Sequence, residues 1–292
     1  MTMRTMPRIL VTGATGMLGR DVCRELERRG NEYRGVGSAE MDVRDPSAVE
    51  AVLTAYHPET VIHCAAWTNV DAAEKPENAE ACRAINAIGT GNVARACQRI
   101  GARMILISTD YVFSGQGQRP WRPEDPAGPL NVYGQSKWEA EQAIRRELER
   151  WCVVRTSWLY GREGRSFART ILGRSCQSDP LRVVNDQIGT PTFTEDLARL
   201  LVDMAEAEVA GTYHAVNEGG YISWYEFARE IVARSAGSAS VIPVTTEEYG
   251  LALAQRPKNS RLDTASLDEA GIMRLPDWRS ALARFLSENQ NS

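Results

Sequence analysis

The sequence predicts an α/β protein with a doubly wound parallel sheet and a smaller, mixed lobe towards the carboxyl end. Over the first 160 residues, short β-branched runs alternate with amphipathic helical segments, as in sheets whose parallel strands are joined by right-handed crossovers. The first run ends in a glycine-rich turn that leads directly into a helix. Beyond Gly161 the alternation gives way to helices separated by loops that contain proline and glycine, which predicts the second lobe.

Five short runs predict strands, and their alternation with helices indicates a buried parallel sheet. They occupy 8–12, 33–36, 60–64, 103–108 and 152–155. The segments between them have helical periodicity; in the first of these, Leu18, Val22 and Leu26 fall on one face. We expect helices over 17–29, 48–56, 80–100 and 137–150 and, in the second lobe, over 167–172, 195–206, 223–234 and 278–287.

The composition is that of an ordinary globular protein of 292 residues, 43% hydrophobic and 25% charged. Thirty-four basic and 38 acidic residues give a net charge of −4, so we expect no extended positive field for nucleic acid or an anionic membrane. No apolar run reaches the roughly 18 residues of a membrane span, and the run after Pro7 is too short for a secretory signal. The six cysteines are scattered, without a CxxC pair, which indicates buried thiols in a reducing compartment rather than disulfides or a metal site. We therefore expect a cytoplasmic protein.

The turn after the first strand has the spacing GxxGxxG. Glycines at this place allow a tight turn and a close approach of the backbone to a pyrophosphate, while the helix amino terminus offers free N–H groups. The sequence therefore predicts a dinucleotide-binding domain of the Rossmann type over residues 1–160. We expect cofactor contacts from Gly13, Thr15, Gly16, Met17, Leu18 and Gly19.

The residues after the second strand bear on the choice of dinucleotide. An acidic residue usually binds the ribose 2′-hydroxyl of NAD about 20 residues beyond the glycines, but Ser38 is found in this region instead. A small hydroxyl side chain tolerates the 2′-phosphate of NADP, yet no arginine follows the strand to pair with it, since Arg34 lies within the strand. The sequence favours NADPH, with NADH as the alternative.

A second constellation combines Tyr133 and Lys137, in the pattern YxxxK, with a hydroxyl residue, Thr109, at the end of the fourth strand. Tyrosine and lysine four residues apart share one face of a helix. Lowering the pKa of a phenol from about 10 to about 7 needs roughly 4 kcal/mol. A lysine ammonium about 5 Å away would supply roughly 3 kcal/mol at an effective dielectric constant near 20. We therefore expect Lys137 to lower the pKa of Tyr133 and make it a proton-transfer group.

With these motifs in place, the sequence resembles the extended short-chain dehydrogenases/reductases. Further motifs follow in order: STDYVF at 108–113, PLNVYG at 129–134, RTSWLY at 155–160, NDQIGTPT at 185–192 and RPKNSRL at 256–262. This series resembles the dTDP-4-dehydrorhamnose reductases within that superfamily and spans nearly the whole chain. The resemblance implies reduction of a C4 ketone on a nucleotide sugar with NADPH.

The resemblance also implies roles for individual residues. Tyr133 would donate the proton, Lys137 would bind the nicotinamide ribose, and Thr109 would donate a hydrogen bond to the substrate carbonyl. The cofactor would further contact Ser38, Asp42 and Val43 near the adenine end, and Cys64, Ala65 and Ala66 beyond the third strand. The substrate would contact Asp110, Val112, Phe113, Trp158, Asn185 and Arg256. Residues 161–292 would then be mainly a substrate-binding lobe, with about 183–217 returning to the core sheet.

Two departures from the family pattern leave alternatives open. Some relatives have arginine at the position of Ser38, which bears on cofactor preference. Some bacterial members are reported as magnesium-linked dimers that use acidic residues, and Asp21 and Glu195 fall near those positions. The two residues do not form a convincing ligand set. Asp21 lies early in a predicted helix, where the helix dipole favours an acidic residue without any metal. Mg²⁺, and the choice between monomer and homodimer, therefore stay open.

Other functions remain as alternatives. A 4,6-dehydratase of this superfamily has an Asp-Glu pair after the threonine, whereas Asp110 is followed by Tyr111 here. A 4-epimerase would retain its nicotinamide and recycle it. A non-catalytic regulatory subunit, like the methionine adenosyltransferase beta subunit, would bind dinucleotide without turnover.

Overall fold

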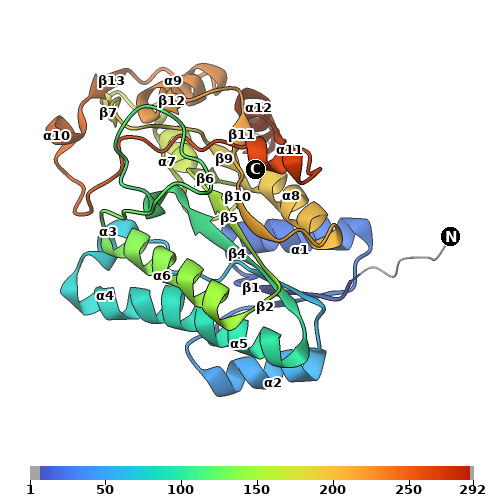
Figure 1. Ribbon diagram of the computed structural model, residues 1–292. Coiled ribbons are helices and arrows are strands. Elements are labelled where there is room, and N and C mark those ends of the chain that lie inside the picture. The colour runs from blue at the N-terminus through green and yellow to red at the C-terminus, as the bar shows by residue number, and fades with distance from the viewer. Residues whose placement is uncertain (1–6, 290–292) are drawn as a thin grey trace.

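The computed structural model describes residues 7–289 and contains a central sheet of six parallel strands in the order β10-β5-β4-β3-β1-β2 (Figure 1). The first six residues, including Arg4, lie outside the described part. The predicted fold class, a doubly wound parallel sheet with a mixed second lobe, is confirmed. The strands of the sheet are β1 (Ile9–Thr12), β2 (Tyr33–Val36), β3 (Thr60–His63), β4 (Arg103–Thr109), β5 (Trp151–Thr156) and β10 (Gly211–His214).

Burial explains the strand order. Every residue of β1, β3 and β4 is buried, which suits central strands that are covered on both faces. In contrast, β2 and β10, whose residues are mostly accessible, form the two edges. The strand order reverses between β1 and β3. The chain passes from β1 to β2 on one side of β1 and then crosses to β3 on the other side. Ligands of open α/β sheets bind outside the carboxyl ends of strands at such a point.

Helices cover both faces of the sheet (Figure 1). On one face α1 (Met17–Arg29) packs against α8 (Thr194–Glu206), so the predicted apolar face of α1 meets Leu197 and Leu201 in one core cluster. The opposite face is covered by α2 (Pro46–Tyr56), α5 (Thr90–Ile100) and α6 (Val132–Glu147). Within residues 183–217, α8 packs against α1 and β10 pairs with β5 at one edge of the sheet.

Two of the predicted helices differ from the structure by more than two residues at a boundary. The helix expected over 80–100 begins earlier and has three parts: α4 (Pro76–Arg83), the π-helical η1 (Ala84–Gly89) and α5. The helix expected over 137–150 runs from Val132 to Glu147. It begins at Val132 because the Asn131 side chain accepts a hydrogen bond from the Gly134 N–H and caps the first turn. The correction places Tyr133 inside the first turn of α6.

The second lobe has a separate apolar core, centred on Tyr160, Phe193, Phe227 and Phe285. Its helices are α7 (Phe167–Arg174), α9 (Trp224–Arg234), α10 (Thr246–Tyr249), α11 (Ala265–Glu269) and α12 (Trp278–Asn289). Its short strands are β6 (Leu159–Tyr160), β7 (Leu181–Val184), β8 (Ile188–Gly189), β9 (Thr192–Phe193), β11 (Asn217–Glu218), β12 (Ile222–Ser223), β13 (Val241–Val244) and β14 (Leu275–Asp277). Two one-turn elements, α3 (Val70–Ala73) and the 3₁₀ turn η2 (Asp110–Val112), follow β3 and β4.

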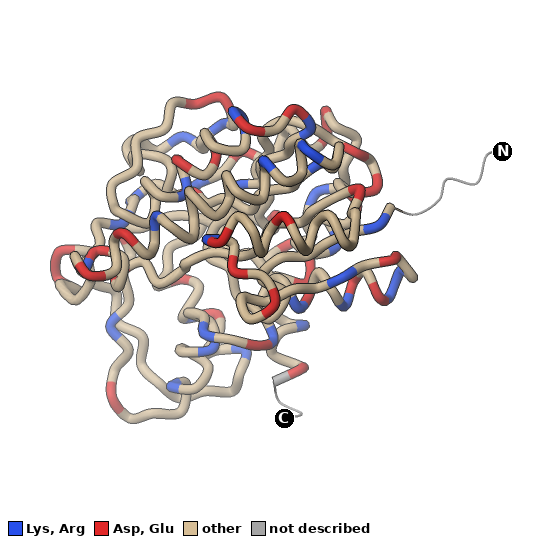
Figure 2. The backbone as a smooth tube through the Cα atoms, turned by 90° about the horizontal axis from the view of Figure 1, so that it is seen from below, with Lys and Arg blue, Asp and Glu red and all other residues tan. Residues whose placement is uncertain are grey.

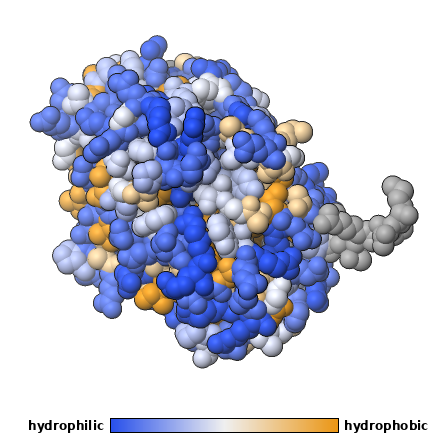
Figure 3. Space-filling model, viewed as in Figure 1, coloured by the Kyte–Doolittle hydropathy of each residue, from blue (hydrophilic) through white to orange (hydrophobic). Residues whose placement is uncertain are grey.

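The surface carries mixed charge and scattered apolar residues. Figure 2 shows basic and acidic positions interspersed along the backbone, and Figure 3 shows a mainly hydrophilic face with small, separate apolar patches. Among the described residues, no helix is both long enough and apolar enough to span a bilayer.

Candidate functional site

The glycine turn lies at the reversal point of the sheet, where the loops after β1 and β3 meet. Gly13 has a φ of +64°, and a Cβ at this residue would lie 2.6 Å from the Ala65 backbone nitrogen. A Cβ at Gly19 would overlap the Gly13 carbonyl. The N-cap residue of α1, Gly16, provides no side-chain hydrogen bond to the first N–H groups of the helix. These N–H groups can therefore bind a phosphate, and the turn fits the predicted dinucleotide.

The region expected to hold the adenine end of the cofactor lies beyond β2. Ser38 is exposed, and Asp42 forms an ion pair with Arg44 at 2.6 Å. The hydrogen bond from Arg44 holds the pKa of Asp42 below its usual range. Val43 is buried in the core cluster that includes residues of β1 and α5. Arg44 is a cationic group near this end that the sequence interpretation did not single out.

Thr109, Tyr133 and Lys137 are brought together at the carboxyl edge of β4. The Thr109 hydroxyl neighbours the Tyr133 phenol, and the Tyr133 ring packs edge-on against Tyr111 with centroids 5.8 Å apart. Lys137, which is only 3% exposed, lies one turn further along α6 and donates from Nζ to the Ile107 carbonyl at 2.6 Å. The three residues of the predicted constellation therefore converge beside the loops of the glycine turn.

The prediction that the pKa of Tyr133 is lowered is wrong. Burial, and then the charge of Asp110, raise the pKa of Tyr133, against a smaller lowering by the Thr109 hydroxyl. Burial also lowers the pKa of Lys137 to about 8, against the opposing charge of Glu141. The sequence estimate treated both groups as partly solvated and omitted the cost of burying each charge.

The loop after β3 is fixed by the π-helical segment η1. Asn86, which is fully buried, accepts a hydrogen bond from the Trp67 N–H at 2.8 Å and donates to the Ser136 hydroxyl at 2.9 Å. Ser136 in turn donates to the Tyr133 carbonyl at 2.7 Å. Asn86 thus links the loop that carries Cys64, Ala65 and Ala66, all partly exposed, to the helix that carries Tyr133. π-Helical turns of this kind are frequent at functional sites.

The expected substrate residues on β4 and η2 divide into two groups. Asp110 is 2% exposed, accepts a hydrogen bond from the Thr109 hydroxyl at 3.0 Å, and lies beside Tyr133. Val112 and Phe113 are fully buried in a small core, where the Phe113 ring stacks on Trp121. The side chains of these two residues are not accessible, and the substrate contact expected of them stays a prediction.

A cavity of about 390 Å³ lies between α7, β7, α9 and the segment before Arg256. Arginine and aromatic side chains line it: Phe167, Arg174, Arg182, Trp224, Tyr249 and Arg256. Trp158, which has a φ of +52°, stacks on Trp224 with centroids 3.7 Å apart. Asn185 is exposed near this cavity and accepts a hydrogen bond from the Ser223 hydroxyl at 2.7 Å.

Arg256 also connects this cavity to the site at β4. It donates to the Asp71 carboxylate at 2.7 Å and to the Tyr111 hydroxyl at 3.0 Å. The other oxygen of Asp71 accepts from the N–H groups of Leu253 and Ala254, each at 3.1 Å. Asp71, on α3, thereby fastens the 253–256 segment to the core. The sequence interpretation missed Asp71, because nothing in its local sequence separates it from an ordinary helix-turn carboxylate.

The two acidic residues considered for Mg²⁺ are already engaged. Asp21 accepts hydrogen bonds from Arg24 at 2.8 Å and from Thr194 at 2.6 Å. Glu195 is paired with Arg162 at 2.6 Å and with Arg199. Within residues 7–289, no three His, Cys, Asp or Glu side chains are grouped so that they could hold a metal ion.

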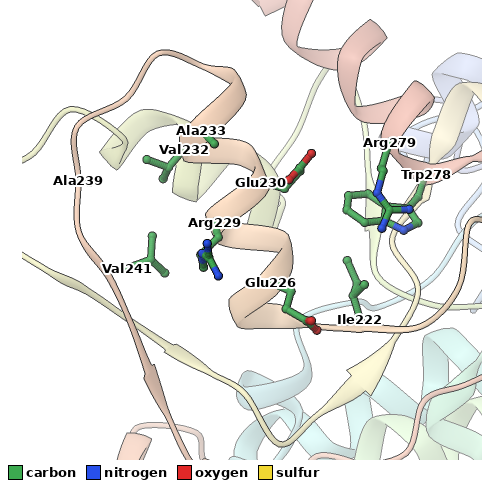
Figure 4. A pocket seen from close by; sticks show the side chains of 10 residues that line it. All are labelled: Ile222, Glu226, Arg229, Glu230, Val232, Ala233, Ala239, Val241, Trp278 and Arg279. Atoms are coloured by element: carbon green, nitrogen blue, oxygen red, sulfur yellow. The ribbon is translucent and has the colours of Figure 1, made fainter.

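A separate cavity of about 450 Å³ lies on the second lobe between α9 and α12 (Figure 4). It is lined by Arg229 and Glu230 on α9 and by Trp278 and Arg279 on α12, with the Arg279 guanidinium 4.4 Å from the Trp278 ring centroid. None of the predicted site residues lines it.

The parallel sheet, the glycine turn at its reversal point and the Thr109–Tyr133–Lys137 group define an extended short-chain dehydrogenase/reductase. Comparison with known proteins makes the assignment specific. The family model of the RmlD substrate binding domain matches residues 7–291, and the chain belongs to this family.

Similar proteins extend over nearly the full length of the chain. It is 42% identical to a dTDP-4-dehydrorhamnose reductase of Streptomyces griseus, over 94% of this chain and 92% of that protein. It is 40% identical to the spore coat polysaccharide biosynthesis protein SpsK of Bacillus subtilis, over 98% and 99%. The crystal structure of dTDP-4-dehydrorhamnose reductase from Bacillus anthracis in complex with NADP is 37% identical and superimposes with a TM-score of 0.92, covering 97% and 99% of the two chains.

Proposed function

We propose that the protein reduces the C4 ketone of dTDP-4-dehydro-L-rhamnose to give dTDP-L-rhamnose, with NADPH as the reductant. The observation that carries the proposal is the convergence of Thr109, Tyr133 and Lys137 beside the glycine turn at the reversal point of the sheet. Family membership and the named activity of the similar proteins support the same substrate. We assign the dinucleotide to residues 1–160 and the nucleotide sugar mainly to 161–292.

The residues at the glycine turn fit a dinucleotide, since a Cβ on Gly13 or Gly19 would fill the space that the backbone leaves there. The free N–H groups of α1 would bind the pyrophosphate, and the loop at 64–66 would lie along the cofactor. The likeness to a structure that contains NADP supports NADPH. Bound NADPH supplies the hydride that the ketone carbon accepts.

Tyr133 is the group that we assign to proton donation. Its pKa is raised by burial, so the phenol is protonated at neutral pH and can deliver a proton to the oxygen that becomes an alkoxide. Lys137 is held by the Ile107 carbonyl, which fixes the ammonium one helical turn from the phenol. Its charge would stabilise the phenolate left behind, because the attraction of opposite charges is strong in a buried site.

The arginine-lined cavity is the place that we assign to the nucleotide. Arg174, Arg182 and Arg256 supply positive charge for a diphosphate, and Phe167 and Trp224 supply apolar surface for a base or deoxyribose. Arg256 also contacts Tyr111, whose ring packs on Tyr133. A nucleotide held in the cavity would therefore have its sugar directed towards the Thr109–Tyr133 pair.

To test the proposal, purified protein is mixed with dTDP-4-dehydro-L-rhamnose and either NADPH or NADH. The absorbance at about 340 nm is followed, and the product sugar is identified. We expect stoichiometric oxidation of NADPH and formation of dTDP-L-rhamnose. The variant Tyr133→Phe should bind NADPH normally and lose most turnover; undiminished turnover would remove Tyr133 from the role of proton donor.

The same assay separates the alternatives. A 4-epimerase would be purified with bound NAD and would consume no NADPH. A dehydratase would need an acid next to Asp110, where Tyr111 is found. A non-catalytic subunit would bind NADPH but reduce no ketosugar.

A further inference from the structure

Asp110 is a buried carboxylate at the centre of the site with one oxygen unused by the chain. It is 2% exposed and directly follows β4. Its Oδ1 accepts a hydrogen bond from the Thr109 hydroxyl at 3.0 Å. Its Oδ2 is buried without a hydrogen-bond partner among the described residues. A buried carboxylate with an unsatisfied oxygen is costly, which makes the protonation state of Asp110 important.

The hydrogen bonds of Thr109 can be assigned completely, because a hydroxyl has one proton to donate. That proton is directed to Asp110. The Thr109 oxygen accepts from the Tyr111 N–H at 3.2 Å. With Asp110 ionised, the Thr109 proton is therefore not available to a substrate carbonyl.

We propose that Asp110 is a positioning residue that decides where the Thr109 hydroxyl proton points. The ionised carboxyl holds that proton, and the protonated carboxyl donates to the Thr109 oxygen and releases the threonine proton towards the ketone oxygen. This inference rests on the proposed reduction of a ketone. Asp110 keeps its own proton throughout the step, so the proton that reaches the new alkoxide still comes from Tyr133.

The surroundings of Asp110 favour such a change near neutral pH. Burial raises its pKa to about 6, while the neighbouring Ser260 and Thr109 hydroxyls and the charge of Arg256 act in the opposite direction. The other titratable groups that face it are Tyr111 and Tyr133. The ionised form of Asp110 raises the pKa of Tyr133, so protonation of Asp110 also makes the phenol a better proton donor.

The first test needs no substrate. The pH titration of the Asp110 carboxyl is followed by ¹³C NMR in the wild-type protein and in Thr109→Val, with Asp110→Asn to assign the signal. Because a donated hydrogen bond favours the charged form, loss of the Thr109 hydroxyl should raise the pKa of Asp110 measurably above its wild-type value. An unchanged pKa would show that Thr109 does not donate to Asp110 and would overturn the proposal.

The second test is the pH dependence of kcat/KM for dTDP-4-dehydro-L-rhamnose with NADPH, corrected for the decay of NADPH in acid. In the wild type we expect kcat/KM to fall roughly a hundredfold as Asp110 ionises, the usual effect of losing one oxyanion donor. This fall in kcat/KM with rising pH should be absent from Asp110→Asn, from Thr109→Val and from the double variant, and it should be retained in Thr109→Ser. A step that persists in Asp110→Asn or in Thr109→Val would contradict control through Thr109.

The two tests also separate this inference from the proposed function. A wild-type protein that never reduces the ketosugar defeats the reductase assignment, and the role towards the ketone oxygen with it. If the protein reduces the ketosugar but the pKa of Asp110 is the same in the wild type and in Thr109→Val, only the inference about Asp110 is contradicted. Thermal unfolding of each variant identifies any that fail to fold.

Discussion

The buried ion pair between Glu141 and Arg155 supports the site from beneath and gives the sharpest stability prediction. The two side chains are 0% and 2% exposed. Glu141 accepts from Arg155 Nε and Nη2, each at 2.8 Å, from the Ser108 hydroxyl at 2.6 Å and from Arg145 at 2.9 Å. Since Ser108 precedes Thr109 on β4 and Glu141 lies one turn beyond Lys137 on α6, the pair fixes the strand and the helix that carry the site.

Removing one partner leaves the other charge buried and uncompensated, which costs about 3 to 5 kcal/mol. We therefore expect Glu141→Met to lower the free energy of unfolding by about 4 kcal/mol. Replacing both partners, in Glu141→Met with Arg155→Met, should cost far less than the sum of the single changes. The exposed pair of Glu50 and Arg99 provides the control, and Glu50→Met should change stability by less than about 1 kcal/mol.

Urea denaturation of the four variants measures these differences. The pH dependence supplies a second check: burial alone would raise the pKa of Glu141, but the bonds from Arg155 outweigh it and the pKa is lowered. A lowered folded pKa contributes stability that is complete above the unfolded pKa of about 4.3 and is lost as the pH falls through the folded value. The double variant should lack this acid loss. Additive single effects, or a Glu141→Met cost no larger than that of Glu50→Met, would refute the reasoning.

Three further predictions concern ligands. Gly13→Ala forces a Cβ onto the Ala65 backbone at a positive φ, so NADPH binding followed by fluorescence should weaken at least about tenfold, and an unchanged Kd would contradict the role of the turn. Asp71→Asn removes the ion pair to Arg256, which is part-exposed and worth about 1 kcal/mol. The KM for the nucleotide sugar should therefore rise roughly fivefold while the affinity for NADPH stays unchanged. An equal loss of affinity for the nucleotide sugar and for NADPH would indicate misfolding. Ser38→Arg adds a cation near the cofactor ribose, and the NADPH-to-NADH ratio of kcat/KM should rise about tenfold; no rise would place the 2′-phosphate elsewhere.

Local patterns in the sequence predicted the sheet and its helices well. The apolar periodicity of Leu18, Val22 and Leu26 and the mainly apolar central strands are local signals, and the structure confirms them. The start of α6 was missed although its signal was present: Asn131 is an N-cap residue just ahead of Tyr133. The π-helical segment at Asn86 could not be predicted, because it depends on tertiary hydrogen bonds to Trp67 and Ser136.

The chemistry of the site was only partly predictable for the same reason. The motifs placed Thr109, Tyr133 and Lys137 in one group, since each lies at a strand end or on one helix face. The direction of the pKa shifts depends on how deeply each group is buried and on Asp110, which sequence spacing does not reveal. Asp71 and Arg256 are 185 residues apart, and only the fold brings them into contact.

Transfer of deuterium tests the central claim most directly. The protein is incubated with dTDP-4-dehydro-L-rhamnose and NADPH that carries deuterium at the transferable position of C4, and the product is examined by NMR. The account predicts a single deuterium at C4 of the rhamnosyl group. Oxidation of the cofactor without deuterium at that carbon, or a ketosugar recovered unchanged, would contradict it.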